Sequence, residues 1–238
     1  MKRRIIFCAI IIALFVCSFF AISYLPYLKT KTTLNKTIAK IENEKNDELA
    51  LVSEIKKTYK NNEIVGILEI PNEDYKAVIT QSSDNKKYLN HDEYGNKNKI
   101  GNPFLDYRVN INDSNKILIY GHNSRYVDMP FKVLENYYDY DYFKNHKYIL
   151  IKTEEKTFKY EIFSVYVETS DWDYMKIDFK NEDEWQSHLN KLKNNSIYDT
   201  EVEVSGEDKI LVLQTCSTKK EYRSLAKKFL LVISRRVD

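Results

Sequence analysis

The pattern of apolar and polar positions sets the first residues of the chain apart from the rest. Residues 5–25 are uncharged and mostly apolar, and Lys2, Arg3 and Arg4 precede them. A helix of about 21 residues spans a hydrocarbon core of roughly 30 Å. The pattern predicts a single-pass membrane anchor over residues 1–28, with the N-terminus cytoplasmic because basic residues stay on that side. A cleaved signal peptide is the alternative, but no convincing small-x-small cleavage site follows the apolar run.

The next stretch, residues 29–62, is charged and poor in aromatic side chains. Pro26 ends the apolar run before it, and the polar stretch 43–47 divides it in two. We expect two short helices here, which pack on the following domain rather than form a coiled coil. Each has one apolar face, made by Leu34, Ile38 and Ile41 in the first helix and by Val52, Ile55 and Tyr59 in the second.

From residue 63 onward the chain shows short apolar or alternating runs bounded by turn residues, a pattern typical of β-strands. Tyrosine and β-branched side chains are frequent in these runs. The pattern predicts one mainly β domain over residues 63–238, a closed or nearly closed eight-stranded β-barrel with α-helical insertions. The predicted strands cover residues 64–70, 75–79, 103–108, 116–120, 147–152, 157–167, 209–214 and 228–234.

Two helical insertions interrupt these strands. A short, aromatic-rich helical segment is expected over residues 128–143. A second helix, in the insertion before the last two strands, begins after Asn181, because Glu184 follows it at the spacing of a capping box. One side of this helix is an apolar stripe that predicts core packing, not a cofactor site, and consists of Trp185, Leu189 and Leu192.

Composition excludes several function classes. The 37 Lys and Arg residues are nearly balanced by 35 Asp and Glu residues, so no basic field indicates a nucleic-acid partner. The five glycines are too scattered to build a phosphate-binding loop. No group of residues has the spacing of a calcium loop or a zinc cluster, so we expect neither a metal nor another cofactor.

The cysteines give the first indication of chemistry. Cys8 and Cys17 lie in the apolar run, where a thiol behaves as a small apolar group. Cys216 therefore has no partner in the exported part of the chain, where cysteines are usually paired or absent. Such a lone thiol is either buried and inert or kept for its reactivity, and the residue alone leaves both alternatives open.

Two predicted strands end in side chains that can work together. Strand 209–214 runs into Cys216, and strand 116–120 runs into His122. A neighbouring cation favours the reactive thiolate, and an imidazole can protonate a departing amine. Arg223, which stays charged and offers a fork of donors, is the expected donor to the oxyanion of an acyl-transfer step, with Lys228 as the alternative.

The other candidates are weaker. The remaining three histidines lie in polar or surface contexts, and no acidic residue is clearly placed to orient His122. Asp106 and Asp113 are candidates for that task only by their proximity in the sequence.

These motifs together resemble those of the sortases. The sequence YGHN, residues 120–123, is followed by L-x-TC at residues 213–216 and by a downstream arginine. IVGILEIP, residues 64–71, and YLNHDEYGNKNKIGNPFLDYR, residues 88–108, narrow the resemblance to class B. It covers the chain from about Ile64 to the C-terminus.

The resemblance implies a sortase-like barrel and a membrane-anchored cysteine transpeptidase. Cys216 would attack the Thr carbonyl of a C-terminal sorting signal of the NPxTx or SPxTG kind. An amine of a lipid II-type peptidoglycan precursor would then take over the surface protein. In sortases the arginine opens the strand after the cysteine loop. Here Lys227 and Lys228 precede that strand, and Arg223 lies five residues before Lys228. Either the loop is longer in this chain and Arg223 still reaches the site, or Lys228 has taken the position.

The resemblance also implies where the substrate binds. The insertion over residues 168–200 would wall the groove, with Ser170, Tyr174 and Thr215 as predicted contacts. Two other functions stay open at this point: an extracytoplasmic cysteine peptidase that releases its product to water, and a membrane-tethered binding protein with an inert thiol. The sorting motif, the acceptor amine and the choice between anchoring and pilus assembly do not follow from the sequence.

Overall fold

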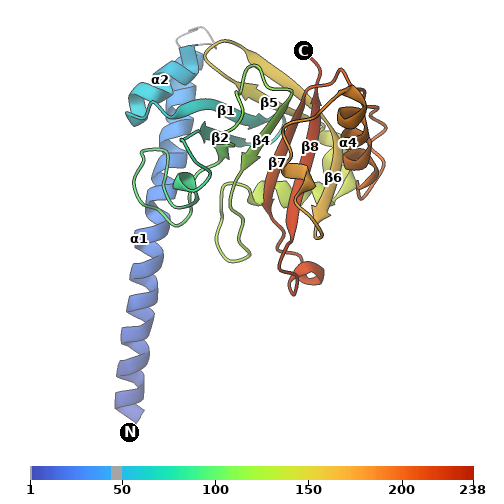
Figure 1. Cartoon of the computed structure of the whole chain (residues 1–238). Helices are drawn as coiled ribbons and strands as arrows, with labels where there is room; N and C mark the ends of the chain where they lie inside the picture. The colour runs from blue at the N-terminus through green and yellow to red at the C-terminus, as the bar shows by residue number, and fades with distance from the viewer. Residues whose placement is uncertain (1, 44–49) are drawn as a thin grey trace.

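The eight predicted strands form a closed barrel in the computed structural model, which describes residues 2–43 and 50–238 (Figure 1). The barrel order is β1-β2-β3-β4-β7-β8-β6-β5, so the predicted fold class is confirmed. The strands are β1 (Ile64–Ile70), β2 (Tyr75–Thr80), β3 (Phe104–Leu105), β4 (Lys116–Tyr120), β5 (Tyr148–Lys152), β6 (Thr157–Glu168), β7 (Ile210–Cys216) and β8 (Phe229–Arg236).

Strand β3 is much shorter than the strand that the sequence predicts over residues 103–108. The backbone leaves the sheet at Asp106, whose carboxylate accepts a hydrogen bond from the Arg108 N–H in a tight turn. The Val109 N–H also donates to the Asp106 carbonyl. An aspartate that binds the backbone two residues on favours a turn over a strand.

Both faces of the central strands are buried, which explains their continuous apolar runs. On β4, Ile117 and Ile119 enter one core cluster, while Leu118 and Tyr120 enter another. The second cluster is covered by helix α4 (Glu182–Asn194) through the predicted apolar stripe. The Asn181 side chain accepts from the Glu184 N–H, as the capping spacing predicts.

The remaining short helices lie in the connections of the barrel. The predicted helical segment over residues 128–143 forms two elements, a 3₁₀ helix η2 (Lys132–Tyr138) and helix α3 (Tyr140–Asn145). Three further 3₁₀ helices are η1 (Lys87–Leu89), η3 (Asp173–Met175) and η4 (Lys220–Tyr222).

The N-terminal part contains helices α1 (Lys2–Asn43) and α2 (Ala50–Tyr59). Helix α1 runs through position 26, where an end was expected. A proline inside a helix removes one backbone hydrogen bond and its ring crowds the carbonyl four residues before it, yet this helix continues to Asn43. The predicted polar break at residues 43–47 lies almost entirely outside the described residues. The first of the two expected short helices is therefore the C-terminal part of α1 and not a separate helix. As expected, this part and α2 pack on the barrel, in a cluster formed by Leu34, Ile38, Leu51, Val52, Ile55, Tyr59, Ile64, Ile67 and Val78.

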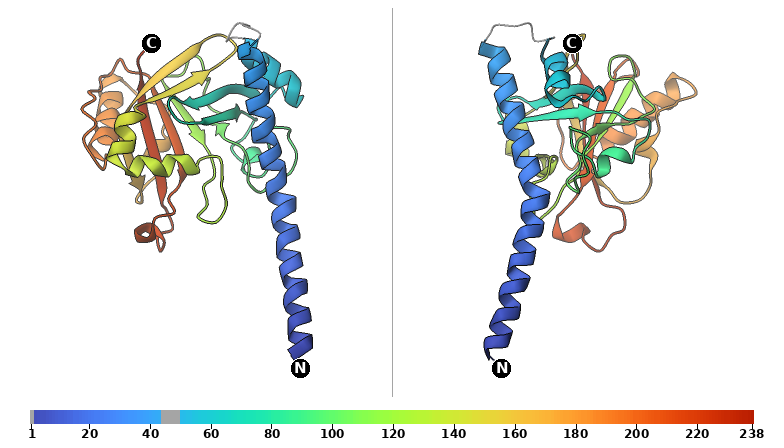
Figure 2. Two further views of the ribbon diagram at one scale, coloured as in Figure 1. Left: turned by 180° about the vertical axis from the view of Figure 1, so that it is seen from behind. Right: turned by 90° about the vertical axis from the view of Figure 1, so that its left-hand side faces the viewer.

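The first half of α1 extends away from the barrel (Figures 1 and 2). Several large apolar side chains between Ile6 and Val16 are exposed there. Within the part of the chain that the structure describes, no helix reaches both the length and the apolarity of a membrane span. The loop after β4 and the loop between β7 and β8 point in the same direction as the N-terminal end of α1 (Figures 1 and 2).

Candidate active site

The parallel pairing of β4 with β7 determines where the two reactive side chains lie. Tyr120 pairs with Gln214 in register, and the Gly121 N–H continues the ladder with a 3.0 Å bond to the Gln214 carbonyl. His122 and Cys216 each follow two residues beyond that pair. Because parallel strands end at the same edge of a sheet, both residues reach one end of the barrel, where they line a pocket of about 320 Å³.

Two side-chain hydrogen bonds fasten these strand ends to each other. The Thr215 hydroxyl donates to the Gly121 carbonyl at 2.8 Å, and the Asn123 amide nitrogen donates to the Cys216 carbonyl at 3.0 Å. Each bond runs from one motif to the backbone of the other. The motifs YGHN and TC are therefore one structural unit, although more than ninety residues separate them.

The His122 ring is oriented by a backbone carbonyl. Its Nε2 lies 2.8 Å from the Leu89 carbonyl, which can only accept, so Nε2 carries the proton. Nδ1 is then the nitrogen that can exchange a proton with a substrate or with the thiol. Gly101 has a positive φ of 67°, and a Cβ there would lie 3.1 Å from the ring carbon Cδ2. A side chain at Gly101 would therefore crowd the ring.

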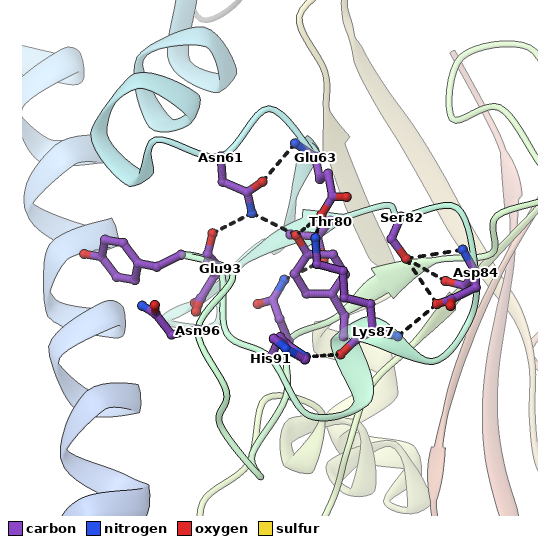
Figure 3. Close-up of polar contacts among 12 residues, drawn as sticks. Asn61, Glu63, Thr80, Ser82, Asp84, Lys87, His91, Glu93 and Asn96 are labelled. Atoms are coloured by element: carbon purple, nitrogen blue, oxygen red, sulfur yellow. Dashed lines mark hydrogen bonds and ion pairs between the residues drawn. The ribbon is translucent and has the colours of Figure 1, made fainter.

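The segment that supplies this carbonyl is tied to the start of β1 (Figure 3). The Tyr88 hydroxyl donates to the Glu63 carboxylate at 2.6 Å, and Lys87 forms an ion pair with the same carboxylate. Asn61 donates to the Tyr88 hydroxyl and to the Glu93 carbonyl. This network holds η1, and with it the Leu89 carbonyl, in place beneath His122.

Cys216 is half-buried at the end of β7, opposite Phe229 of β8. Burial raises the pKa of its thiol, and the positive charge of Lys228 acts in the opposite direction. The Lys228 carbonyl accepts from the Ser217 N–H at 2.7 Å, which keeps this lysine next to the cysteine loop. The thiolate is thus favoured by a nearby cation and disfavoured by its dry surroundings.

The pocket next to Cys216 has largely aromatic walls. Trp172 packs against Phe229 with ring centroids 5.1 Å apart, and Tyr174 lies beside both rings. The Tyr174 hydroxyl is buried and has no hydrogen-bond partner among the described residues. A mostly apolar pocket with one unpaired hydroxyl can take an extended peptide and one polar group of it.

The insertion that carries Trp172 and Tyr174 is attached to the far end of β4 by Lys116. The buried Lys116 ammonium donates to the Lys176 carbonyl at 2.8 Å and to Nε2 of His188 at 2.7 Å. Burial lowers the pKa of Lys116 to about 7, and the Asp173 carboxylate opposes this shift. Burial likewise lowers the pKa of His188 to about 3, so that its ring is neutral and accepts the bond.

Asp106 supports the opposite wall of the pocket instead of orienting His122. Its carboxylate accepts from the Tyr120 hydroxyl at 2.7 Å, from Asn85 at 3.0 Å and from Arg108 through two bonds. Burial acts to raise the pKa of Asp106, but the bonds from Arg108 and Tyr120 outweigh it and lower the pKa to about 2. Asp113, the other candidate, is exposed on a turn.

A second pocket of about 320 Å³ opens on the other side of Cys216. Arg223 and Lys228 both line it together with the cysteine. Arg223 is exposed at the end of η4, and its carbonyl accepts from the Lys228 ammonium at 3.0 Å. The structure thus places both candidate cations, Arg223 and Lys228, in the lining of the pocket that Cys216 also lines.

The three predicted substrate contacts differ in their placement. Tyr174 lines the aromatic pocket. Thr215 is fully buried and bonded to Gly121, and the exposed Ser170 donates to the Glu168 carboxylate. The other histidines lie elsewhere. His146 stacks on Tyr142, His91 bonds the Lys87 carbonyl and His188 bonds the Lys116 ammonium.

Sequence reasoning missed several residues of the site. Arg125, three positions after His122, lines the second pocket, and Trp172 and Phe229 line the first. The position of Arg125, two residues after the YGHN motif, was an available signal. No sequence signal indicates the Leu89 carbonyl, because every residue has this backbone group and only the fold brings it to His122.

The chain is similar to known proteins over most of its length. The model of the family described as "Sortase domain" matches residues 68–236. Sortase B of Listeria monocytogenes is 34% identical over 198 residues, which cover 82% of this chain and 76% of that protein. The solved structure of the Listeria monocytogenes sortase B has 30% identity and a TM-score of 0.66, and the match covers 75% of this chain and 97% of that chain.

A solved structure of a Staphylococcus aureus sortase B-substrate complex has a TM-score of 0.76 at 24% identity. The match covers 87% of this chain and 94% of that chain. At that identity the likeness supports the fold.

The Asp106 network generates a prediction about stability. Asp106→Asn should lower the free energy of unfolding at pH 7 by about 2 kcal/mol, since the pKa falls from 3.8 to about 2 and one pKa unit is worth about 1.4 kcal/mol. The folded-state pKa lies below the unfolded value, so the stabilisation is complete above pH ~4 and is lost as the pH falls toward 2.

Urea unfolding followed by tryptophan fluorescence measures this difference at pH 7 and at pH 3. The gap between wild type and Asp106→Asn should narrow at pH 3. Asp113→Asn, at an exposed position, is the matched control and should change little. A gap that stays the same at both pH values would contradict the ionised role of Asp106.

Proposed function

Because the chain belongs to the sortase family, with class B sortases as its relatives, it is a cysteine transpeptidase, and we propose that it anchors surface proteins to the cell wall. Its substrate is a C-terminal sorting signal of the NPxTx or SPxTG kind, cleaved after Thr. The acceptor is an amine of a lipid II-type peptidoglycan precursor. The observation that carries the proposal is the placement of His122 and Cys216 on one pocket by the β4–β7 pairing.

The reaction proceeds in two acyl transfers. Nδ1 of His122 takes the thiol proton as the Cys216 sulfur attacks the Thr carbonyl carbon. When the C–N bond to the next residue breaks, the same nitrogen gives that proton to the departing amine. A thioester between substrate and enzyme results. The acceptor amine then attacks the same carbon, a new amide forms and the C–S bond breaks. The proton that the amine loses returns through His122 to the sulfur.

Each transfer passes through a tetrahedral intermediate whose oxygen becomes negative and needs a donor. Arg223 and Lys228 are the two candidates. Arg223 offers a fork of donors from a position that lines the pocket with Cys216. Lys228 directly precedes β8 and carries the charge that acts on the thiol.

The aromatic pocket is the proposed site of the sorting signal. Trp172, Tyr174 and Phe229 would pack against its extended backbone and its proline, and the unpaired Tyr174 hydroxyl would bond one of its polar groups. Ser170 and Thr215 remain predicted contacts. Their hydroxyls would have to leave their present partners to reach a substrate.

We propose further that residues 1–28 anchor the enzyme in the cell membrane, that residues 29–62 connect it and that residues 63–238 form the extracytoplasmic catalytic domain. Support comes from the uncharged run after Lys2, Arg3 and Arg4 and from the exposed apolar side chains of α1. The loops around the site point in the same direction as the N-terminal end of α1 (Figure 1). An anchored N-terminus would therefore turn the site toward a lipid-linked acceptor.

The first prediction concerns the two reactive side chains. Cys216→Ala should abolish cleavage of sorting-signal peptides, because the thioester cannot form. His122→Ala should lower turnover by ~10² to 10⁴-fold, the usual effect of a positioned proton donor. Mass spectrometry of a peptide library incubated with candidate amines gives both cleavage and transfer.

The matched control is His146→Ala, at a histidine that stacks on Tyr142 and lines neither pocket. This substitution should change turnover little. Near-normal cleavage by Cys216→Ala, or a loss under tenfold in His122→Ala, would show that the site lies elsewhere. Cleavage that gives only the hydrolysed product with every amine would favour a peptidase instead.

The second prediction concerns the cation. Removing an oxyanion donor costs about 2.7–4 kcal/mol, so either Arg223→Gln or Lys228→Gln should lose roughly 10²-fold or more in turnover, and the other variant should lose little. Lys228→Gln should also raise the thiol pKa, because the lysine charge favours the thiolate. The pH dependence of Cys216 alkylation measures that shift. If both variants turn over like wild type, the oxyanion donor is not in this loop.

The third prediction concerns the membrane. The full chain should remain in the membrane fraction after a carbonate wash, whereas a chain that starts at residue 29 should be released. In cells stripped of their wall, external protease should degrade the catalytic domain. Protection of Cys216 from that protease would overturn the proposed topology.

A further inference from the structure

We propose that the second pocket at Cys216 binds the acceptor, and that it selects an amine with an anionic group, such as a carboxylate, a few bonds away. The inference rests on the proposed transpeptidase function and deepens it by naming the chemical class of the second substrate. It is carried by the charge of the pocket, by its place beside the thiol and by an unpaired buried oxygen.

The pocket concentrates positive charge. Its lining includes Arg125, Lys219, Arg223 and Lys228, and among the described residues that line it none is acidic. The chain as a whole has 37 basic and 35 acidic residues, so this concentration is local. A cleft lined by one sign of charge raises the local concentration of the oppositely charged ligand.

The loop after Cys216, which forms part of the pocket, is held by contacts with Glu135, Arg125 and Tyr138. The Glu135 carboxylate accepts from the Thr218 N–H at 2.7 Å and from the Thr218 hydroxyl at 2.8 Å. Arg125 donates to the Thr218 carbonyl at 2.7 Å, and the Lys219 ammonium lies 3.9 Å from the centre of the Tyr138 ring. Glu135 is thus engaged with Thr218. The partners of Arg125, Lys219 and Lys228 are two carbonyls and a ring, which leave the positive charges of these pocket-lining side chains unneutralised.

An unpaired acceptor belongs to Asn123, which lines this pocket together with Cys216. The Asn123 amide nitrogen bonds the Cys216 carbonyl, but its Oδ1 is buried without a hydrogen-bond partner among the described residues. A buried acceptor without a partner costs about 1–3 kcal/mol. An amine that reaches the Cys216 thioester from this pocket brings the N–H donor that Oδ1 lacks.

The two pockets differ in what they can bind, and Cys216 lines both. The aromatic pocket suits the part of the sorting signal that becomes the acyl group. The basic pocket then remains for the leaving amine of the first transfer and for the acceptor amine of the second. Four cations repel a simple ammonium, and an anionic neighbour on the acceptor offsets that repulsion. The same cations favour the neutral amine, which is the nucleophile.

The test uses the full-length enzyme, a sorting-signal peptide that it cleaves, and three acceptors: Gly-Asp-amide, Gly-Asn-amide and Gly-Lys-amide. The reacting glycine amine is the same in all three, and the Asp and Asn forms have nearly the same shape. Transfer at limiting acceptor should be about fivefold or more faster with Gly-Asp-amide than with Gly-Asn-amide, and slowest with Gly-Lys-amide. The preference should shrink as salt is added.

The variant Arg125→Gln/Lys219→Gln should bring the ratio of Gly-Asp-amide to Gly-Asn-amide transfer close to one. Lys97→Gln, which removes an exposed cation outside the pocket, should keep the wild-type ratio. Because the readout is a ratio between two acceptors, a general loss of activity does not imitate the effect.

Equal transfer to all three acceptors by wild type would overturn this inference while leaving the transpeptidase proposal intact. A preference that survives in the double variant would overturn the assignment of the pocket. Failure to form any thioester, seen as the absence of an acyl-enzyme mass, would overturn the transpeptidase proposal and this inference with it.

Discussion

The parallel pairing of β4 with β7 is the constraint on which the site depends. One register, Tyr120 with Gln214, places His122 and Cys216 at the same end of the barrel. A slip of one residue would turn every side chain of β7 to the opposite face and would bury the thiol differently. The apolar clusters on both faces of these strands oppose such a slip, and the bonds of Thr215 and Asn123 fix the last residues. Packing therefore sets the register, and the register sets the chemistry.

Strand β4 also links the site to the walls of the substrate pocket. Its first residue, Lys116, holds the insertion through the Lys176 carbonyl and His188, and its last, Tyr120, rests on Asp106. The insertion carries Trp172 and Tyr174 to the pocket that His122 also lines. A buried lysine paired with a neutral histidine is an unusual anchor. Two acceptors, the Lys176 carbonyl and His188 Nε2, replace water around the buried Lys116 nitrogen, and burying such a group requires partners of this kind.

The sequence predicted the strands well where their apolar pattern reflects burial, and it predicted the site where reactive residues follow such strands. Seven strands were predicted within about two residues, because a strand buried on both faces reads as a continuous apolar run. Strand β3 was overestimated, since the turn at Asp106 overrides the strand preference of its neighbours. The continuation of α1 through Pro26 was missed because the sequence prediction ends the helix at this one proline, whereas the residues on both sides of it are helical. His122 and Cys216 could be singled out only as a pair. The Leu89 carbonyl that orients His122 could not, because it depends on the fold of the segment around it.

The thiol lies between two pockets of opposite character, and this arrangement gives the reaction an order. The aromatic pocket stabilises a peptide whether or not the thioester has formed, because packing does not depend on the charge at Cys216. The basic pocket depends on charge, because four cations line it and no acidic residue among its described lining residues offsets them. Burial raises the pKa of the Cys216 thiol, so the resting sulfur carries little negative charge and the positive field of this pocket is present before and after acylation. The chemistry at sulfur then separates the two stages: an anionic acceptor in the basic pocket has no carbon to attack until the peptide in the aromatic pocket has formed the thioester.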